Sequence, residues 1–180
     1  MDRPTKVEVI EGKQPTAREN QVASLTGRHV LIVGFGNPLR SDDGVGWHVA
    51  QQLARDLSRP GVQIVALQQL TPEVADFASR AEKVLFVDAA HEGVPGEIQC
   101  RRIAPAASSG EHSHEFSPSA ILALAETLYG RYPPAWLLTV CGETFATGDS
   151  MSAAVSAAIP AVLERIVRFI AGDEKSARER

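Results

Sequence analysis

The stretch LIVGFGNPLRSDDGVG, residues 31–46, contains the pattern from which the fold is predicted. It begins as a short apolar run, which is typical of a buried strand, and continues through two glycines and an asparagine. Asp42 and Asp43 then precede residues 45–57, whose apolar positions fall on one helical face. A strand, a glycine-rich loop and a helix are therefore predicted in succession.

Strand and helix patterns continue to alternate after this unit. Short apolar runs indicate the strands, and amphipathic segments that follow an N-cap residue or a proline indicate the helices. The predicted strands are residues 29–35, 62–69, 83–88, 97–103 and 135–140, and the predicted helices are residues 45–57, 72–80, 118–130 and 155–170.

The order of these elements predicts an α/β fold. The βαβαβ opening favours parallel strands joined by right-handed crossovers. The turn GVPGE, residues 93–97, is typical of a hairpin, so the strand that follows it is predicted to be antiparallel, at a sheet edge. We therefore expect a three-layer α/β/α sandwich with a mostly parallel, mixed five-stranded sheet and an antiparallel edge strand.

Length and composition indicate how this fold is arranged along the chain. The chain has 180 residues, of which 44% are hydrophobic, and this suits one globular domain with its own core. Residues 1–27 are polar and without a sustained period, so we expect a loosely ordered N-terminal extension. Residues 28–172 are predicted to form a single α/β domain, and residues 173–180 a charged tail.

Charge and hydropathy disfavour several classes of partner. The formal net charge is -4 and no basic stripe is present, so we expect no nucleic acid and no membrane as partner. No apolar run approaches the roughly 18 residues of a membrane span, and the N-terminus lacks the apolar core of a signal peptide. The protein is therefore expected to be cytoplasmic, with Cys100 and Cys141 as thiols.

Polar residues that could carry chemistry are predicted to meet at one edge of the sheet. Asp43 follows the first strand and Asp88 ends the third, and sites in open α/β sheets lie at the carboxyl ends of the parallel strands. Residues 104–117, at about 3.3 Å per extended residue, are long enough to bring His112, His114 and Glu115 back to the same edge. The loop after the last strand is predicted there too, with Glu143, Thr144 and Asp149.

Each of these residues also has a structural interpretation. For Asp42 an N-cap role is favoured, and for Asp43 a first-turn acid and a functional acid are about equally supported by the local pattern. Asp88 could cap the turn that follows it. Histidines in loops rich in serine and glycine are most often surface residues, and His91 is interpreted as structural or surface, close enough to Asp88 to support a ligand indirectly.

Two carboxylates and one imidazole from separate loops form a set that can hold a divalent metal with open coordination positions. Other site types are less well supported. A dinucleotide fingerprint would need glycine where Leu39 stands, and the chain has no P-loop lysine motif, no GxSxG elbow and no HExxH helix.

The motifs GFGNPLRSDDGVG, VLFVDAA and HSHEF, in this order and spacing, resemble those of the hydrogenase maturation proteases. These endopeptidases trim the large subunit of nickel-iron hydrogenases, and the match covers roughly residues 29–170. The resemblance implies a cytoplasmic hydrolase, of the aspartic or metal-dependent type, that removes the C-terminal peptide of the large-subunit precursor after nickel insertion. The bound nickel of the precursor would be part of the recognition signal.

The resemblance also implies which residues form the site. Asp43, Asp88 and His114 match the family's catalytic and metal-contacting residues, with nickel presented by the precursor and other divalent cations able to occupy the site. His112 lies two residues from His114 and would point to the same side of an extended segment, and His114 is chosen because it is closer to the helix start.

The chain departs from the family pattern in its N-terminal extension and in CGETFATGDS, residues 141–150. These departures concern substrate identity more than fold. Two alternative functions are also considered. One is a nickel-binding chaperone or sensor that uses the same residues without hydrolysis. The other is a small-molecule hydrolase or transferase whose glycine loop holds a phosphate, although the missing third glycine counts against it.

Overall fold

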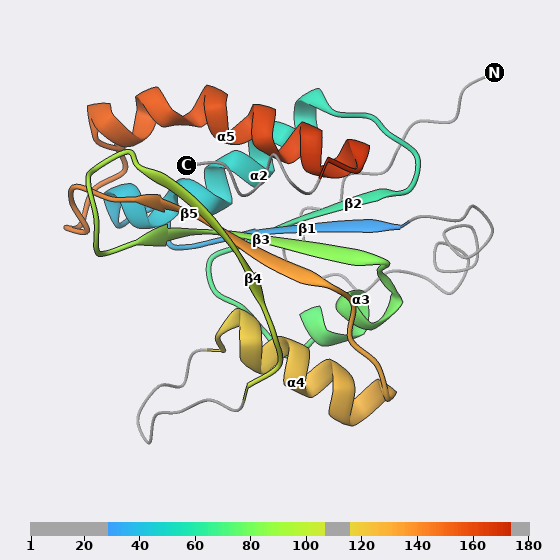
Figure 1. Ribbon diagram of the computed structural model, residues 1–180. Coiled ribbons are helices and arrows are strands. Elements are labelled where there is room, and N and C mark those ends of the chain that lie inside the picture. The colour runs from blue at the N-terminus through green and yellow to red at the C-terminus, as the bar shows by residue number, and fades with distance from the viewer. Residues whose placement is uncertain (1–28, 107–115, 174–180) are drawn as a thin grey trace.

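The computed structural model describes residues 29–106 and 116–173, and Figure 1 shows their arrangement in three layers. The strands are β1 (Val30–Phe35), β2 (Val62–Leu67), β3 (Lys83–Ala90), β4 (Ile98–Ile103) and β5 (Ala135–Cys141). The helices are η1 (Ser41–Gly44), α2 (Val45–Asp56), α3 (Val74–Arg80), α4 (Pro118–Tyr129) and α5 (Ala153–Ala171). The predicted N-terminal extension, and all but the first residue of the predicted tail, lie outside the described residues, so the domain boundaries stay predictions.

The sheet has the strand order β2-β1-β3-β5-β4. The pairs β1–β2, β1–β3 and β3–β5 are parallel, and β4 pairs with β5 in antiparallel orientation at the edge. The predicted α/β sandwich with a mixed five-stranded sheet and an antiparallel edge strand is therefore confirmed, and the predicted elements agree with the observed ones to within two residues at each end.

The predicted hairpin between β3 and β4 was wrong, because β5 lies between these two strands. The turn has hairpin composition, with positive φ angles of 124° at Gly93 and 81° at Gly96. It nevertheless carries the chain past the end of β5, where Gly96 N donates to Cys141 O at 2.8 Å and Cys141 N donates to Glu97 O at 2.9 Å. Since β5 is buried along most of its length and β4 is largely exposed, β5 suits an interior position and β4 an edge.

Two hydrophobic clusters cover the two faces of the sheet. Figure 1 shows α2 and α5 on one face and α3 and α4 on the other. Residues of β1 alternate between the clusters, as the period of a strand requires. The first cluster includes Ile32, Val49, Leu85, Leu138, Ile166 and Phe169. The second includes Leu31, Val33, Phe77, Phe86, Ile121 and Leu122.

The ends of α4 follow the signals in the sequence. Ser117 is the N-cap, and its Oγ accepts a hydrogen bond from Ala120 N at 3.2 Å. Gly130 ends the helix in the left-handed region, with a φ of 71°. These caps provide hydrogen-bond partners for backbone groups that have none within the helix. They therefore fix the residues at which α4 begins and ends.

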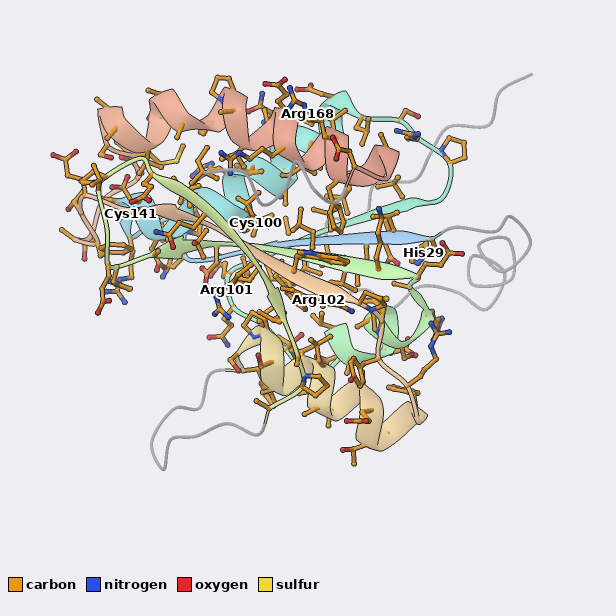
Figure 2. The ribbon with its side chains drawn as sticks, in the orientation of Figure 1. His29, Cys100, Arg101, Arg102, Cys141 and Arg168 are labelled. Atoms are coloured by element: carbon orange, nitrogen blue, oxygen red, sulfur yellow. The ribbon has the colours of Figure 1, made fainter. Side chains whose placement is uncertain are left out.

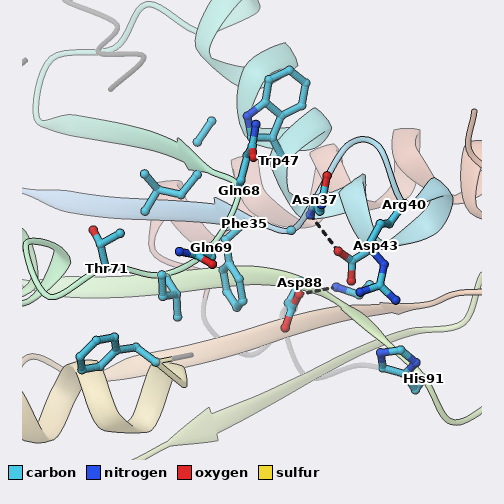
Figure 3. A pocket seen from close by; sticks show the side chains of 16 residues that line it. Phe35, Asn37, Arg40, Asp43, Trp47, Gln68, Gln69, Thr71, Asp88 and His91 are labelled. Atoms are coloured by element: carbon cyan, nitrogen blue, oxygen red, sulfur yellow. Dashed lines mark hydrogen bonds between the residues drawn. The ribbon is translucent and has the colours of Figure 1, made fainter. Parts of the chain in front are cut away.

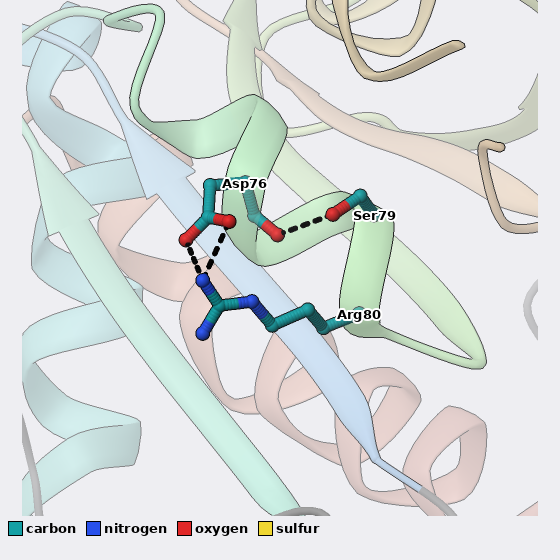
Figure 4. Close-up of polar contacts among 3 residues, drawn as sticks. All are labelled: Asp76, Ser79 and Arg80. Atoms are coloured by element: carbon teal, nitrogen blue, oxygen red, sulfur yellow. Dashed lines mark hydrogen bonds and ion pairs between the residues drawn. The ribbon is translucent and has the colours of Figure 1, made fainter. Parts of the chain in front are cut away.

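The short helix α3 is supported by polar contacts along one side. Arg80 Nη2 donates to the two carboxylate oxygens of Asp76 at 2.6 and 2.5 Å, and Ser79 Oγ donates to Asp76 O at 2.8 Å (Figure 4). Such a pair at i and i+4 stabilises an exposed helix by a few tenths of a kcal/mol, about 0.2–0.5. The helix therefore owes more to its buried residues, which include Val74, Ala75 and Phe77.

Cys100 and Cys141 lie on the neighbouring strands β4 and β5 and are both thiols (Figure 2). Burial raises the pKa of the Cys141 thiol, and the carboxylate of Glu97 raises it further. Cys141 is therefore protonated and unreactive at neutral pH. Within residues 29–106 and 116–173, no helix combines the length and the apolar character that a membrane span requires.

Candidate functional site

The loop between β1 and α2, residues Gly36–Gly44, is called the site loop below. Its path depends on glycine at positions where a side chain has no room. Gly36 has a φ of 131°, and a Cβ there would lie 1.9 Å from Asp43 O. At Gly46, in the first turn of α2, a Cβ would lie 2.2 Å from Val87 O. The glycines thus let the site loop fold back on itself and let α2 lie directly against the sheet.

Asp43 is held by this fold of the loop. It lies in η1, and its Oδ2 accepts a hydrogen bond from Asn37 N at 2.8 Å. The Asn37 side chain in turn accepts from Leu39 N at 2.9 Å. Asp43 is therefore fixed beside the carboxyl end of β1, because the start of the site loop donates a hydrogen bond to its carboxylate.

Asp88 lies on the neighbouring strand β3, opposite Thr139 of β5. Its Oδ1 accepts from Ala89 N at 2.8 Å. The strand was predicted to end at Asp88 but continues to Ala90, because residues 89 and 90 still pair with β5. Asp43 thus follows β1 and Asp88 lies on β3, the two strands on either side of the point where the strand order reverses. Open α/β sheets bind their ligands at this point.

Both carboxylates line one pocket of about 710 Å³ (Figure 3). The pocket extends over the carboxyl ends of β1, β2 and β3. Its volume lies in the range of ligand-binding clefts, and its lining combines polar and aromatic side chains. The polar residues besides the two acids are Asn37, Arg40, Gln68, Gln69, Thr71 and His91, and the aromatic residues besides His91 are Phe35, Trp47 and Phe116.

His112, His114 and Glu115 lie outside the described residues, so the assignment of His114 to the site stays a prediction. Phe116, which is described, lines the pocket and is the second residue after His114 in the sequence. In the part of the chain that the structure describes, no group of three histidine, cysteine or acidic residues could hold a metal ion. Asp43 and Asp88 would therefore need a further ligand to bind a divalent metal tightly.

The sequence interpretation did not assign Arg40 to the site, and it considered His91 only as a structural or surface residue close enough to Asp88 to support a ligand. The His91 ring stacks on Phe145, with 3.8 Å between ring centroids and 24° between the planes. Arg40 Nη2 donates to Phe145 O at 3.5 Å. His91 could be associated with the site because it is three residues from Asp88 in the sequence. Its stacking on Phe145 could not be predicted, because Phe145 belongs to a loop that is remote in the sequence.

Asp42 points away from the pocket and is fully buried. Its carboxylate accepts hydrogen bonds from Glu143 N at 2.8 Å, Thr144 N at 3.0 Å and Ser152 N at 2.7 Å. Burial raises the pKa of the Asp42 carboxyl, but these hydrogen bonds outweigh burial and hold its pKa below the ordinary value. The structural interpretation agrees with this position, whereas the predicted N-cap role was wrong, since the N-cap of α2 is Gly44 without a side-chain bond.

The loop after β5, residues 142–152, is called the β5 loop below. It was predicted at the same edge of the sheet with Glu143, Thr144 and Asp149. It does lie against the site loop, with Arg40 and Gly148 joined in a short parallel bridge. None of its residues is among those that line the pocket in the described part of the chain. The β5 loop therefore supports the site loop from outside the pocket.

Comparison of the chain with protein-family models and with curated proteins gives no match. Among solved structures, the maturation protease HycI of Thermococcus kodakarensis superposes with a TM-score of 0.67 at 19% identity, covering 84% of this chain and 99% of that one. The hydrogenase maturating endopeptidase HybD of E. coli gives a TM-score of 0.66 at 19% identity, covering 81% and 94%.

The hydrogenase 2 maturation peptidase of a Thaumarchaeota archaeon gives a TM-score of 0.59 at 25% identity, covering 82% of this chain and 100% of that one. The chain therefore has the fold of the hydrogenase maturation endopeptidases over at least 81% of its length. The resemblance inferred from the three sequence motifs agrees with this shared fold.

Proposed function

We propose that this protein is an endopeptidase that matures a nickel-iron hydrogenase by removing the C-terminal peptide of the large-subunit precursor after nickel insertion. One observation carries the proposal: Asp43, in the loop after β1, and Asp88, on the adjacent parallel strand β3, line one open pocket in a fold shared with hydrogenase maturation endopeptidases. The partner is thus the precursor, and its nickel is part of the substrate.

In the proposed mechanism, Asp43, Asp88 and His114 contact the nickel of the precursor and place the scissile peptide bond in the pocket. Two carboxylates and an imidazole form an incomplete ligand set, which gains affinity when the precursor presents a metal with exchangeable positions. The nickel then acts as a recognition signal, because a precursor that lacks it loses these contacts.

Asp43 is proposed to be the general base of the hydrolysis. It accepts a proton from a water molecule whose oxygen attacks the carbonyl carbon of the scissile bond. The bond to nitrogen then breaks, and the proton goes to the leaving amine. The hydrogen bond from Asn37 N to Asp43 Oδ2 fixes the carboxylate for this step, as the orientation of a base requires.

The remaining lining of the pocket supports a peptide substrate. Gln68 and Gln69 each carry both a donor and an acceptor, which suits the alternating groups of a peptide backbone. Trp47 and Phe116 provide apolar surface for side chains. In Figure 3 Gln69 and Thr71 lie toward one end of the pocket, and Asp43 and His91 toward the other.

The test is cleavage of a nickel-loaded precursor by wild type, Asp43→Asn, Asp88→Asn and His114→Ala. We expect each variant to lose at least about 100-fold in rate, in the range of a lost acid–base group. Asp149→Asn, in an exposed acid of the β5 loop, and His112→Ala are the matched controls and should cleave at the wild-type rate.

A precursor without nickel should remain uncut by the wild type. Cleavage by all three site variants at the parental rate would show that the assignment is wrong. If the free protein instead bound nickel stoichiometrically and left the loaded precursor intact, a nickel chaperone or sensor would replace the protease as the function.

A further inference from the structure

The site loop and the β5 loop are joined residue by residue. Ser41 N donates to Gly148 O at 2.9 Å, and Gly148 N donates to Leu39 O at 2.9 Å. Ser41 Oγ donates to Ala146 O at 3.1 Å. The two segments are about one hundred residues apart in sequence, and these bonds make them one structural unit.

Asp42 lies at the centre of this unit. Among the described residues it is the only buried residue with a charged side chain. Burying a carboxylate is costly unless hydrogen bonds replace its water, and the three N–H groups of residues 143, 144 and 152 do so. Gly142 allows the approach, because a Cβ there would lie 3.1 Å from Asp42 Cβ and 2.5 Å from the Phe145 ring.

The backbone around Asp42 is strained in a way that requires such support. Ser41 has a φ of 50°, which is left-handed and unfavourable for a residue with a side chain, by about 1–2 kcal/mol. Ser41 is the first residue of η1, in which Asp42 points inward and the next residue, Asp43, lines the pocket. The contacts of Asp42 and Ser41 with the β5 loop offset the strain, so the direction of Asp43 depends on them.

We propose that Asp42 is a positioning residue, whose buried carboxylate fixes the orientation of Asp43 by tying the site loop to the β5 loop. Asp42 itself touches no substrate. The expected loss of turnover in Asp42 variants rests on the proposed protease function. The expected displacement of the Asp43 carboxylate does not.

The geometry is tested by NMR on Asp42→Asn, with the amide resonance of Asn37 as reporter. This N–H donates to Asp43, so its shift follows the position of that carboxylate. Asp43→Ala gives the reference shift for a lost bond. Val84→Ala, in the core at the opposite end of β3, is the control for a general loss of stability. We expect the Asn37 resonance to move toward the Asp43→Ala value in Asp42→Asn and to stay unchanged in Val84→Ala.

If only the amides of Glu143, Thr144 and Ser152 moved in Asp42→Asn, the carboxylate would merely tie down the β5 loop, and the proposal would be overturned. Should Asp42→Asn fail to fold, Ser152→Pro and Ser152→Ala provide the same comparison. The φ of Ser152 is -58°, which proline accepts, so the first variant removes the N–H donor to Asp42 and the second keeps it. Both variants lose the Ser152 hydroxyl, which caps α5 and also contacts Asp42, so only the N–H donor distinguishes them. The Asn37 resonance is then expected to move further in Ser152→Pro than in Ser152→Ala, and equal shifts in both variants would contradict the proposal.

Turnover of the nickel-loaded precursor provides the functional arm. We expect kcat of Asp42→Asn to fall by about 10- to 100-fold with KM nearly unchanged, since a base displaced by about 1 Å loses rate and leaves substrate binding intact. Val84→Ala, assayed where it is fully folded, should keep the wild-type kcat. An unchanged kcat in Asp42→Asn would overturn the positioning role, whereas an inactive wild type would overturn the proposed function and leave the Asn37 shift to decide the positioning role.

Discussion

At the scale of single residues, two adjacent acids have opposite environments. Asp42 is buried under three backbone N–H groups, and Asp43 lines the pocket. The sequence pattern indicated a structural Asp42 and left Asp43 between a structural and a functional interpretation. It could not identify the partners of Asp42, because these belong to a loop about one hundred residues away in the sequence. The stacking of His91 on Phe145 was concealed for the same reason, since Phe145 belongs to that remote loop.

Gly36 provides a test at this scale. Its φ is 131°, and an added Cβ would meet Asp43 O at 1.9 Å. We expect Gly36→Ala to lower the free energy of unfolding by about 3 kcal/mol or more, because backbone strain and a steric clash act together. Urea denaturation followed by circular dichroism measures this loss.

Gly130→Ala is the matched control for that measurement. Gly130 also has a positive φ, of 71°, but nothing lies within 4 Å of the position of its Cβ. Its substitution should cost about 1–2 kcal/mol, from the left-handed backbone alone. Equal losses in the two variants would show that the site loop can relax around a side chain at residue 36.

At the scale of elements, the spacing of apolar residues and the capping residues in the sequence predicted the strands and helices well. The apolar strands and the amphipathic helices agreed with the structure, since burial on one or both faces leaves a direct pattern in the sequence. The hairpin between β3 and β4 was wrong because turn composition specifies a chain reversal and not the neighbouring strand. The strand β5, which comes later in the chain, lies between β3 and β4 and pairs with both. Its residues are mostly buried, which suits a strand with a neighbour on each side.

Ser117 provides a test of a helix end. Its Oγ accepts from Ala120 N, so Ser117→Ala should destabilise the protein by about 1 kcal/mol through the loss of the N-cap of α4. Thr127→Ala is the control on the same helix. Thr127 Oγ1 donates to Ala123 O on the exposed last turn of the helix, and alanine has a higher helix propensity than threonine.

Thermal unfolding of the two variants makes the comparison. We expect Ser117→Ala to melt at a lower temperature than wild type, and Thr127→Ala to melt at the same or a slightly higher temperature. A similar decrease in both would indicate that the capping bond adds nothing to the stability of α4.

At the scale of the whole molecule, one sheet separates two cores and gathers the site at one edge. The helices α2 and α5 cover one face, and α3 and α4 cover the other. The parallel strands bring the segments after β1, β2 and β3 together around the pocket. The edge could be predicted because parallel strands share their carboxyl ends, whereas the support from the β5 loop depends on tertiary contacts that no local pattern records.

The separation of the two cores can be measured by additivity. Ile121 of α4 and Ile166 of α5 are both fully buried, in different clusters on opposite faces of the sheet. Each substitution to valine should cost about 0.5–1.5 kcal/mol. Because the side chains share no cluster, we expect the double variant to lose the sum of the two within about 0.5 kcal/mol in urea denaturation. A larger departure from the sum would mean that the two faces are coupled through the sheet.

The opposite directions of Asp42 and Asp43 also restrict how genes for proteins of this kind can diverge. Deletion of a single codon between residues 37 and 42 would move Asp43 to the buried position and Gly44 to the pocket, which would then lack its base. Insertion of a single codon there would move Asp42 to the pocket and leave the N–H groups of residues 143, 144 and 152 without their carboxylate. Gaps in an alignment of homologous genes should therefore avoid this stretch and accumulate instead in exposed turns, such as the one between β3 and β4.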